Sequence, residues 1–406
     1  MIAGCGSSTA QDGKTKITVA TFGEFGYEKL FADYQAAHPD IQIESRVAEF
    51  DAHHKSFITQ LATGRGAADI VAVEEQYLPQ FRQSTDKFAN LADFGALRLK
   101  DQWTPWKWEQ GVTDGGKFVM GLGTDMGGLA MCYRRDLFEK AKLPTNRDEV
   151  AKLWPTWEDF AKVADRFGKA KTGAKFTDSA GTVYAAMLNQ ATENYFAAKD
   201  DSFIADRNPN LQHAFYLAGG IGVKGQTAAV ATYSTPWTVG LKQGSFATLA
   251  CPAWMLALIE QAAGPENAGK WDVTTIPNSG GNQGGSFLTI PKQGAHQKQA
   301  YELASWLTAP EQQKRLFKDK GILSSEPAVY HDPEVLQTTN HYFSDAPIGQ
   351  IFAKSADSLT PNYRGLHDAD VRPNFGRALG RIEEKSQGIT DAFSEAVKDA
   401  RAAIIK

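Results

Sequence analysis

Residues 121–138 read GLGTDMGGLAMCYRRDLF, a glycine-rich segment that leads into an apolar run. Glycines flank the acid Asp125, and an apolar run, Leu129–Tyr133, follows. Glycine permits bends and close backbone approaches, so the pattern predicts an extended segment that enters a new sheet. We interpret it as the first crossing between two lobes, with Asp125 facing the gap between them. A glycine-rich hairpin with a surface aspartate is the alternative.

The residues before this segment alternate between strand and helix patterns. Short β-branched runs predict strands, and apolar residues at helical spacing predict the helices between them. The strands are residues 16–21, 41–47 and 68–73, and the helices are residues 27–37 and 57–62. This βαβαβ order predicts a parallel sheet with right-handed crossovers. Ligands of such sheets bind beyond the carboxyl ends of the strands, where Glu24, Glu74 and Glu75 fall.

The residues after the first crossing contain a second glycine-rich crossing. Residues 280–290 read GGNQGGSFLTI and carry Ser286 and Phe287 into a strand. Residues 242–254 are expected to form a strand that ends at Trp254. In PTWEDF, residues 155–160, Thr156 is expected to cap a helix, with Asp159 completing the capping box. The tail from residue 346 is expected to be mostly helical, ending in one long helix over residues 382–405.

Length and charge limit the class of protein. A chain of 406 residues exceeds one ordinary core and predicts two domains. The net charge of −4, with Lys and Arg scattered, gives no reason to expect a nucleic-acid partner. No run approaches 18 uninterrupted apolar residues, so we expect no segment that spans a membrane.

Motifs for catalysis or metal binding are missing from the sequence, so we expect no metal and no cofactor. The adjacent His53 and His54 are interpreted as the surface start of a helix rather than zinc ligands. GIGVKG at residues 220–225 matches the dinucleotide pattern but lacks its flanking strand and helix, and we expect a loop there. The dense aromatic run WTPWKW, residues 103–108, is expected to pack inside a lobe rather than bind a ligand.

The three cysteines have different expected roles. Cys5 ends an Ile-Ala-Gly-Cys box that resembles a bacterial lipoprotein processing site, and residues 1–14 form a polar tether. Only Met1 precedes that box here, so the apolar stretch of a signal peptide is missing. Outside the cytoplasm Cys132 and Cys251 could form a disulfide. Their apolar surroundings equally suit two buried thiols, and we expect them to be free.

Four stretches together resemble the extracytoplasmic solute-binding proteins of ABC sugar importers, the maltose-binding-protein-like family 1, over residues 15–406. They are ADIV at 68–71, GTD at 123–125 with YRRDLF at 133–138, PTWEDF at 155–160, and GSF at 285–287 with ASWL at 304–307. The resemblance implies an α/β, two-lobed periplasmic-binding-protein-like fold (type II) with three crossings. Lobe 1 would contain residues 15–123 and 287–335, and lobe 2 residues 124–286 and 336–406.

The same resemblance implies a sugar held in the cleft as the lobes close. Asp125 matches the acid that accepts hydrogen bonds from sugar hydroxyls, Trp254 the stacking tryptophan, and Tyr195 a second aromatic wall. The complete set of implied substrate-binding residues is Glu24, Glu74, Glu75, Asp125, Tyr195, Trp254, Ser286, Phe287, Tyr363 and Arg364. An indole covers the apolar face of a sugar ring, and carboxylates accept from its hydroxyls, which supports this choice independently. Asp69 is assigned to a structural hydrogen bond.

The resemblance therefore implies a binding protein and not an enzyme. It would capture an oligosaccharide, expected to be a cello- or malto-type gluco-oligosaccharide, and deliver it to ABC permease subunits. We expect a monomer on the outer face of the cell membrane, attached only through a lipid on Cys5. Two alternatives stay open: a secreted glycoside hydrolase or lyase that uses Glu75 and Asp125, and the same scaffold with a peptide, polyamine or phosphodiester ligand.

Overall fold

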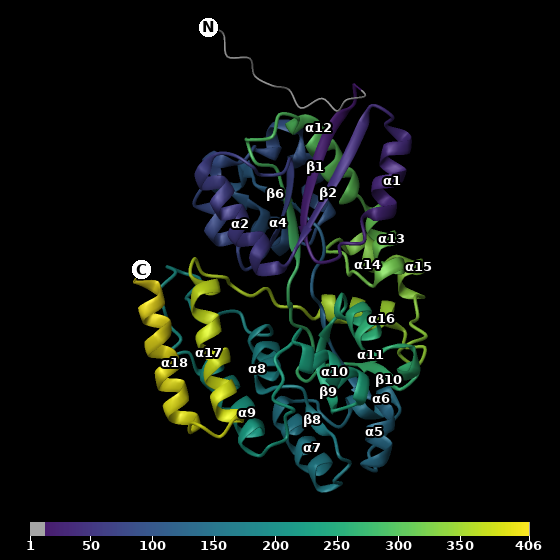
Figure 1. Cartoon of the computed structure of the whole chain (residues 1–406), viewed down its shortest axis with the longest axis vertical. Helices are drawn as coiled ribbons and strands as arrows, with labels where there is room; N and C mark the ends of the chain where they lie inside the picture. The colour runs from purple at the N-terminus through teal and green to yellow at the C-terminus, as the bar shows by residue number, and fades with distance from the viewer. Residues whose placement is uncertain (1–12, 406) are drawn as a thin grey trace. The chain divides into compact units, whose positions relative to one another are not determined.

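The computed structural model describes residues 13–405, which divide into two compact units (Figure 1). Unit 1 contains residues 13–126 and Gly284–His331, and unit 2 contains Gly127–Gln283 and residues 332–405. Both units combine helices with a sheet, so the predicted α/β class is confirmed. Cys5 and residues 1–12 of the predicted tether lie outside the described residues.

Unit 1 is built on a five-stranded sheet in the order β2-β1-β3-β11-β6. The strands are β1 (Thr15–Phe22), β2 (Ile41–Ala48), β3 (Ile70–Glu74), β6 (Gly121–Gly123) and β11 (Ser286–Thr289). β1 pairs in parallel with both β2 and β3, which confirms the predicted βαβαβ arrangement. β11 runs antiparallel between β3 and β6. β6 belongs to the first glycine-rich crossing and β11 to the second, so their pairing places the two crossings side by side in the sheet.

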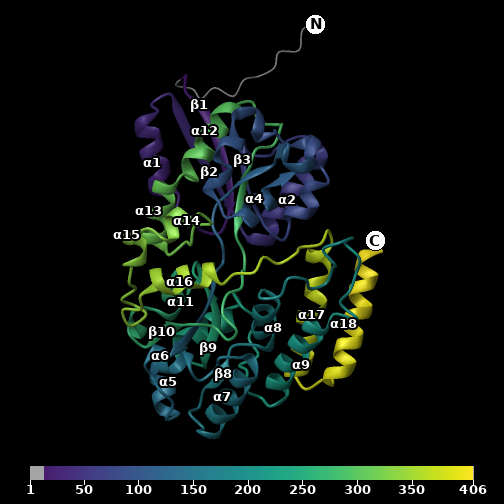
Figure 2. The same ribbon diagram turned by 180° about the vertical axis from the view of Figure 1, so that it is seen from behind.

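Helices cover both faces of this sheet. α1 (Glu28–Ala37) and α2 (Phe50–Thr63) lie on opposite sides of it (Figures 1 and 2). Within β3, Ile70 and Ala72 pack into the core that contains α1, whereas Val71 and Val73 pack into the core that contains α2. Successive side chains of a strand point to opposite faces, so a strand buried on both faces is apolar throughout.

Short elements complete unit 1. Its other helices are α3 (Leu78–Arg82), α4 (Pro105–Gly111), α12 (Gln297–Leu307), α13 (Pro310–Lys320) and α14 (Pro327–Tyr330), and a small hairpin joins β4 (Val112–Thr113) to β5 (Phe118–Val119). Trp103 and Trp108 are buried in the core, as expected for the aromatic run. The Asp69 carboxylate accepts hydrogen bonds from the amide and hydroxyl of Thr18, which confirms its structural role.

Unit 2 has a four-stranded sheet in the order β10-β7-β9-β8. The strands are β7 (Leu129–Arg134), β8 (Lys175–Thr177), β9 (Phe246–Pro252) and β10 (Trp271–Thr274). Its helices are α5 (Arg135–Lys140), α6 (Arg147–Ala151), α7 (Trp157–Lys169), α8 (Ala180–Leu188), α9 (Pro209–Val223), α10 (Thr235–Gln243), α11 (Met255–Ala263), α15 (Pro333–Leu336), α16 (Ile348–Asp357), α17 (Asp368–Glu383) and α18 (Ile389–Ile404). α17 and α18 lie side by side (Figure 2).

The predicted capping box at the start of α7 is confirmed. The Thr156 hydroxyl oxygen accepts from the amide of Asp159, and the same hydroxyl donates to the Asp159 carboxylate. Trp157 at the first helical position is 1 % exposed and packs in the core. The cap and the buried indole together fix where α7 begins.

Two secondary-structure predictions are wrong. Residues 220–223 are not a loop but the last turn of α9. Their glycines allow close packing, since a Cβ on Gly222 would lie 3.1 Å from Glu383 Cγ on α17. The single helix expected over residues 382–405 is instead interrupted between α17 and α18. Lys385 has a φ of 59° there, which a continuous right-handed helix does not allow.

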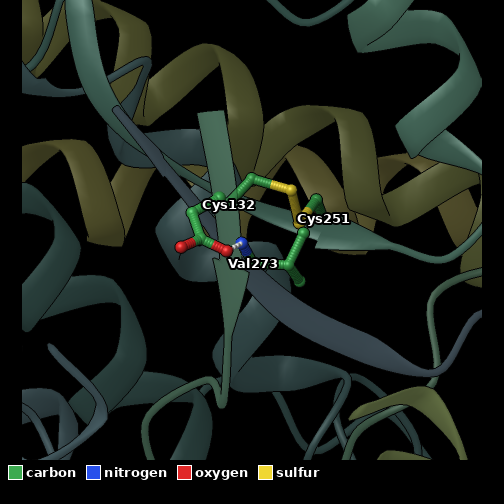
Figure 3. The surroundings of a disulfide bond; sticks show 4 residues. Cys132, Cys251 and Val273 are labelled. Carbon is green, nitrogen blue, oxygen red and sulfur yellow. Dashed lines mark hydrogen bonds between the residues drawn. A yellow bond between two sulfur atoms is a disulfide. The ribbon is translucent and has the colours of Figure 1, made fainter. Parts of the chain in front are cut away.

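Cys132 and Cys251 form a disulfide, so the expectation of free thiols is wrong (Figure 3). Cys132 lies on β7 and Cys251 on the neighbouring antiparallel strand β9, with the two Cα atoms 5.8 Å apart. Val273, which pairs with Cys132 from β10, lies beside the bond. Both cysteines are fully buried in unit 2. Strand register, which the sequence did not reveal, brings together two residues 119 positions apart.

The expected surface position of His53 and His54 is also wrong, because α2 buries both rings. His53 Nε2 lies 2.7 Å from the carbonyl oxygen of Ala72. His54 Nδ1 lies 2.8 Å from the carbonyl oxygen of Phe50, and its Nε2 accepts a 3.2 Å hydrogen bond from the amide of Glu74. Such a ring must be neutral, since an imidazolium has no acceptor. Burial lowers the pKa of His54 to about 3.

Acid is therefore expected to destabilise the fold through His54. The unfolded state binds a proton near the ordinary pKa of about 6.5, whereas the folded ring stays neutral down to about 3. Stability from this group is complete above about pH 6.5 and is lost as the pH falls from 6.5 towards 3, by up to about 1.4 kcal/mol per pH unit. Urea unfolding of the wild type and of His54→Gln between pH 7 and pH 4 measures the difference.

The comparison with His54→Gln is needed because other groups act in the opposite direction. Burial raises the pKa of Asp178 to about 7 and that of Glu326 to about 8, so these acids favour the folded state at lower pH. Subtracting the unfolding free energy of the variant from that of the wild type at each pH removes the contribution of these acids, which both proteins share. Equal pH slopes for the two proteins would contradict the assignment to His54.

Within residues 13–405, no helix combines the length and the apolar character that crossing a membrane requires.

Candidate functional site

Asp125 is fixed directly after β6, at the end of unit 1's part of the first crossing. Its Oδ1 accepts hydrogen bonds from the Thr124 hydroxyl at 2.7 Å and from the Ser286 amide at 3.1 Å. The backbone of Asp125 also pairs with Ser324. Both side-chain bonds fall on Oδ1, and the carboxylate is half-buried. Oδ2 is thus the oxygen best placed to accept from a ligand hydroxyl.

Glu74 and Glu75 end β3 beside the same segment. Ser286 pairs with Glu74 across the sheet, and the Glu75 amide donates to the carbonyl oxygen of Gly285. One Glu74 carboxylate oxygen accepts from the Gln76 amide at 2.8 Å. The structure therefore brings Asp125, Glu74, Glu75 and Ser286 together at one end of the unit 1 sheet, and we call these four residues the acidic edge.

Two predicted site residues of unit 1 lie elsewhere. Glu24 is exposed in the loop after β1, with its carboxylate 3.8 Å from Lys320 Nζ. Phe287 is fully buried in the core that contains α2, so it is a core residue and not a wall of the site. Ser286, the preceding residue of β11, is also buried, and the two side chains point to opposite faces of the sheet.

Lys107 on α4 lies beside the acidic edge, although the sequence reasoning did not select it. Its side chain is 0 % exposed, and its Nζ lies 4.2 Å from the centre of the Phe287 ring. Burial lowers the pKa of Lys107, while the negative charges of Asp125, Glu75 and Glu74 raise it. The aromatic run at residues 103–108 was expected to pack inside a lobe, and only the tertiary structure shows that its lysine lies near three acids.

Trp254 in unit 2 is half-buried at the start of α11, just beyond β9. Its indole Nε1 donates a 3.1 Å hydrogen bond to the carbonyl oxygen of Gln283. The Tyr233 ring, 58 % exposed, stacks near it with the ring centres 6.5 Å apart and the planes at 29°. The two rings form a partly open aromatic surface, which is the chemistry expected of a sugar platform.

Tyr233 was missed because no sequence periodicity marks it. Its φ of 67° places a non-glycine residue in the left-handed region, which is uncommon and often found at functional sites. Trp237, whose ring centre lies 5.7 Å from that of Tyr233, donates from Nε1 to the buried Asp178 carboxylate. Asp178 thereby supports the platform from inside unit 2.

Three further residues selected from the sequence contact other side chains of unit 2. Tyr195 is 1 % exposed and packs against Phe375, and burial raises its pKa to about 12, so it is a core residue and not an aromatic wall. The Tyr363 hydroxyl donates to the Asp201 carboxylate at 3.2 Å. Arg364 donates from Nη2 to the Asn189 side chain at 3.0 Å, and its Nη1 lies 3.5 Å from the buried Asp368 carboxylate.

A metal site is not formed by the residues that the structure describes, among which no three His, Cys, Asp or Glu side chains are suitably grouped. The side chain next to the acidic edge is the lysine Lys107 and not a further metal ligand. The oxygens of the acidic edge are suited to accepting hydrogen bonds from neutral donors.

A model of the bacterial extracellular solute-binding proteins matches residues 29–343. The crystal structure of an extracellular solute-binding protein of family 1 is 39 % identical to this chain and superposes with a TM-score of 0.86, covering 96 % of this chain and 99 % of the other. The chain therefore belongs to the bacterial extracellular solute-binding proteins. It is a binding protein that acts outside the cytoplasm and not an enzyme, and the two-lobed fold implied by the resemblance is confirmed.

Two more distant relatives have named ligands. An arabinooligosaccharide-binding protein of Halalkalibacterium halodurans is 22 % identical over 338 residues, which span 78 % of this chain and 72 % of the relative. An ABC transporter-associated binding protein of B. animalis subsp. lactis, solved with β-1,6-galactobiose, is 20 % identical and covers 97 % of each chain with a TM-score of 0.80.

Proposed function

We propose that this protein captures a neutral oligosaccharide and delivers it to the permease of an ABC importer. The observation that carries the proposal is the aromatic surface of Tyr233 and Trp254, which offers two rings to the apolar face of a sugar. Unit 1 by itself offers the half-buried Asp125 carboxylate as an acceptor for hydroxyl groups, beside the buried Glu74 and Glu75. The oligosaccharide ligands named for two relatives support the same class of ligand.

Isothermal titration against a panel of oligosaccharides tests the proposal. Cello- and malto-oligosaccharides are included because the resemblance implies them, and arabino-oligosaccharides and β-1,6-galactobiose because relatives bind them. We expect binding of at least one sugar in the micromolar range or tighter, about −8 kcal/mol. If no oligosaccharide of the panel binds and a polyamine or peptide does, the non-sugar alternative replaces the sugar proposal.

We also propose that a lipid on Cys5 anchors the protein at the outer face of the membrane. The support is the Ile-Ala-Gly-Cys box and the polar residues that follow it. Expression behind a lipoprotein signal peptide, with labelled fatty acid, should label the wild type and leave Cys5→Ala unlabelled. Equal labelling of both proteins would contradict the anchor.

A further inference from the structure

The buried cation of unit 1 is the starting point. The Lys107 ammonium is fully enclosed, and among residues 13–405 its Nζ has no hydrogen-bond partner. An ammonium carries three donors, and enclosing a charge without a partner is costly. Methionine or leucine would fill the same space at lower cost. A buried charge at this position therefore indicates that its interactions with neighbouring charged groups matter.

Those neighbours are the carboxylates of the acidic edge. Asp125 interacts most strongly with Lys107, followed by Glu75 and Glu74, and the three acids come from the ends of two strands. The Phe287 ring lies under the ammonium and contributes a cation–π contact. The buried Tyr27 also interacts electrostatically with the Asp125 carboxylate. Lys107 is thus directed at the acidic edge from inside unit 1.

The glycines of both crossings make room for this lysine. A Cβ on Gly123 would lie 3.0 Å from Lys107 Cγ, and a Cβ on Gly285 would lie 2.9 Å from its Nζ. Gly285 also has a φ of 124°, a conformation that residues with side chains rarely adopt. The segments on either side of the acidic edge are therefore shaped around the side chain and charge of Lys107.

We propose that Lys107 is a positioning and selectivity residue of the ligand site. Its positive charge stabilises the ionised carboxylates of Asp125, Glu74 and Glu75 as acceptors for hydroxyl groups, through space and without a direct hydrogen bond. It also disfavours a cationic ligand at this edge, where three acids alone would attract one. The site then selects neutral sugars over amines of similar size. This inference rests on the proposed function.

Lys107→Met tests it, because methionine keeps the apolar stem and removes the charge. Two ligands are titrated at about pH 6: the neutral oligosaccharide that the wild type binds best, and the same oligosaccharide with an amino group in place of one hydroxyl. We expect the variant to bind the neutral sugar about tenfold more weakly and to shift the ratio of the two affinities towards the amine by about tenfold or more. A purely structural lysine would not change this ratio.

Lys117→Met, at an exposed lysine of the same unit, is the matched control and should leave both affinities unchanged. If Lys107→Met does not fold, Lys107→Gln removes the same charge and is measured in the same way. A folded variant with wild-type affinity and selectivity overturns the inference and leaves the proposed function intact. A wild type that binds no sugar overturns the proposed function, and the inference with it.

Discussion

Trp254→Ala is expected to weaken oligosaccharide binding by about 30- to 100-fold, a loss of about 2–3 kcal/mol. The indole is half-buried, is held by its bond to the Gln283 carbonyl, and stacks near the exposed Tyr233 ring. Removing it takes away a rigid apolar surface that a sugar ring would otherwise cover. Isothermal titration with the best sugar of the panel measures the loss.

Two control variants separate the ring surface from general damage. Trp254→Phe keeps an aromatic ring but loses the hydrogen bond to Gln283 and part of the ring surface, so its affinity should fall between wild type and Trp254→Ala. Tyr216→Ala removes a 41 % exposed aromatic ring from α9 of the same unit and should leave affinity unchanged. Wild-type affinity in a folded Trp254→Ala protein would exclude this residue from the site.

Removing the Cys132–Cys251 disulfide is expected to destabilise unit 2 by about 2–5 kcal/mol. The bond closes a long segment, 119 residues, and so restricts the unfolded chain strongly. For a unit of this size the melting temperature should fall by about 5–15 °C. Calorimetry of the oxidised wild type and of Cys132→Ala/Cys251→Ala measures the shift.

Hydrogen exchange locates the effect within unit 2. Amides of β7 and β9 should lose protection in the double alanine variant, whereas those of β1 and β3 in unit 1 should keep it. A reductant present during unfolding should reproduce the loss in the wild type and have no effect on the variant. An unchanged melting temperature in the variant would show that the strand pairing alone holds unit 2.

Local patterns predicted much of the fold. The βαβαβ order of residues 16–73 and the Thr156 cap depend on neighbouring residues, and both are confirmed. The predictions for His53, His54 and residues 220–223 failed because burial and helix packing decided them. The polar sequence around His53 and His54 does not indicate that both imidazole rings form hydrogen bonds with the backbone.

The candidate site was predicted in part. Glu74 and Glu75 were selected from the end of a predicted strand, and Asp125 and Ser286 from the two glycine-rich crossings; the structure brings the four residues together. Tyr195 and Phe287 were selected as aromatic residues, and both are buried. The residue type does not show whether an aromatic side chain faces a ligand or packs in a core, so only the tertiary structure distinguishes the two cases.

The sequence by itself determined the strand and helix order, the glycine-rich crossings and the acids at the strand ends, because these depend on residues near one another in the chain. The tertiary structure alone decided three features: the disulfide between β7 and β9, the stacking of Tyr233 on Trp254, and the burial of Lys107 beside the acidic edge. Each joins residues distant in sequence, and their meeting is set by strand register and core packing, which no local pattern encodes.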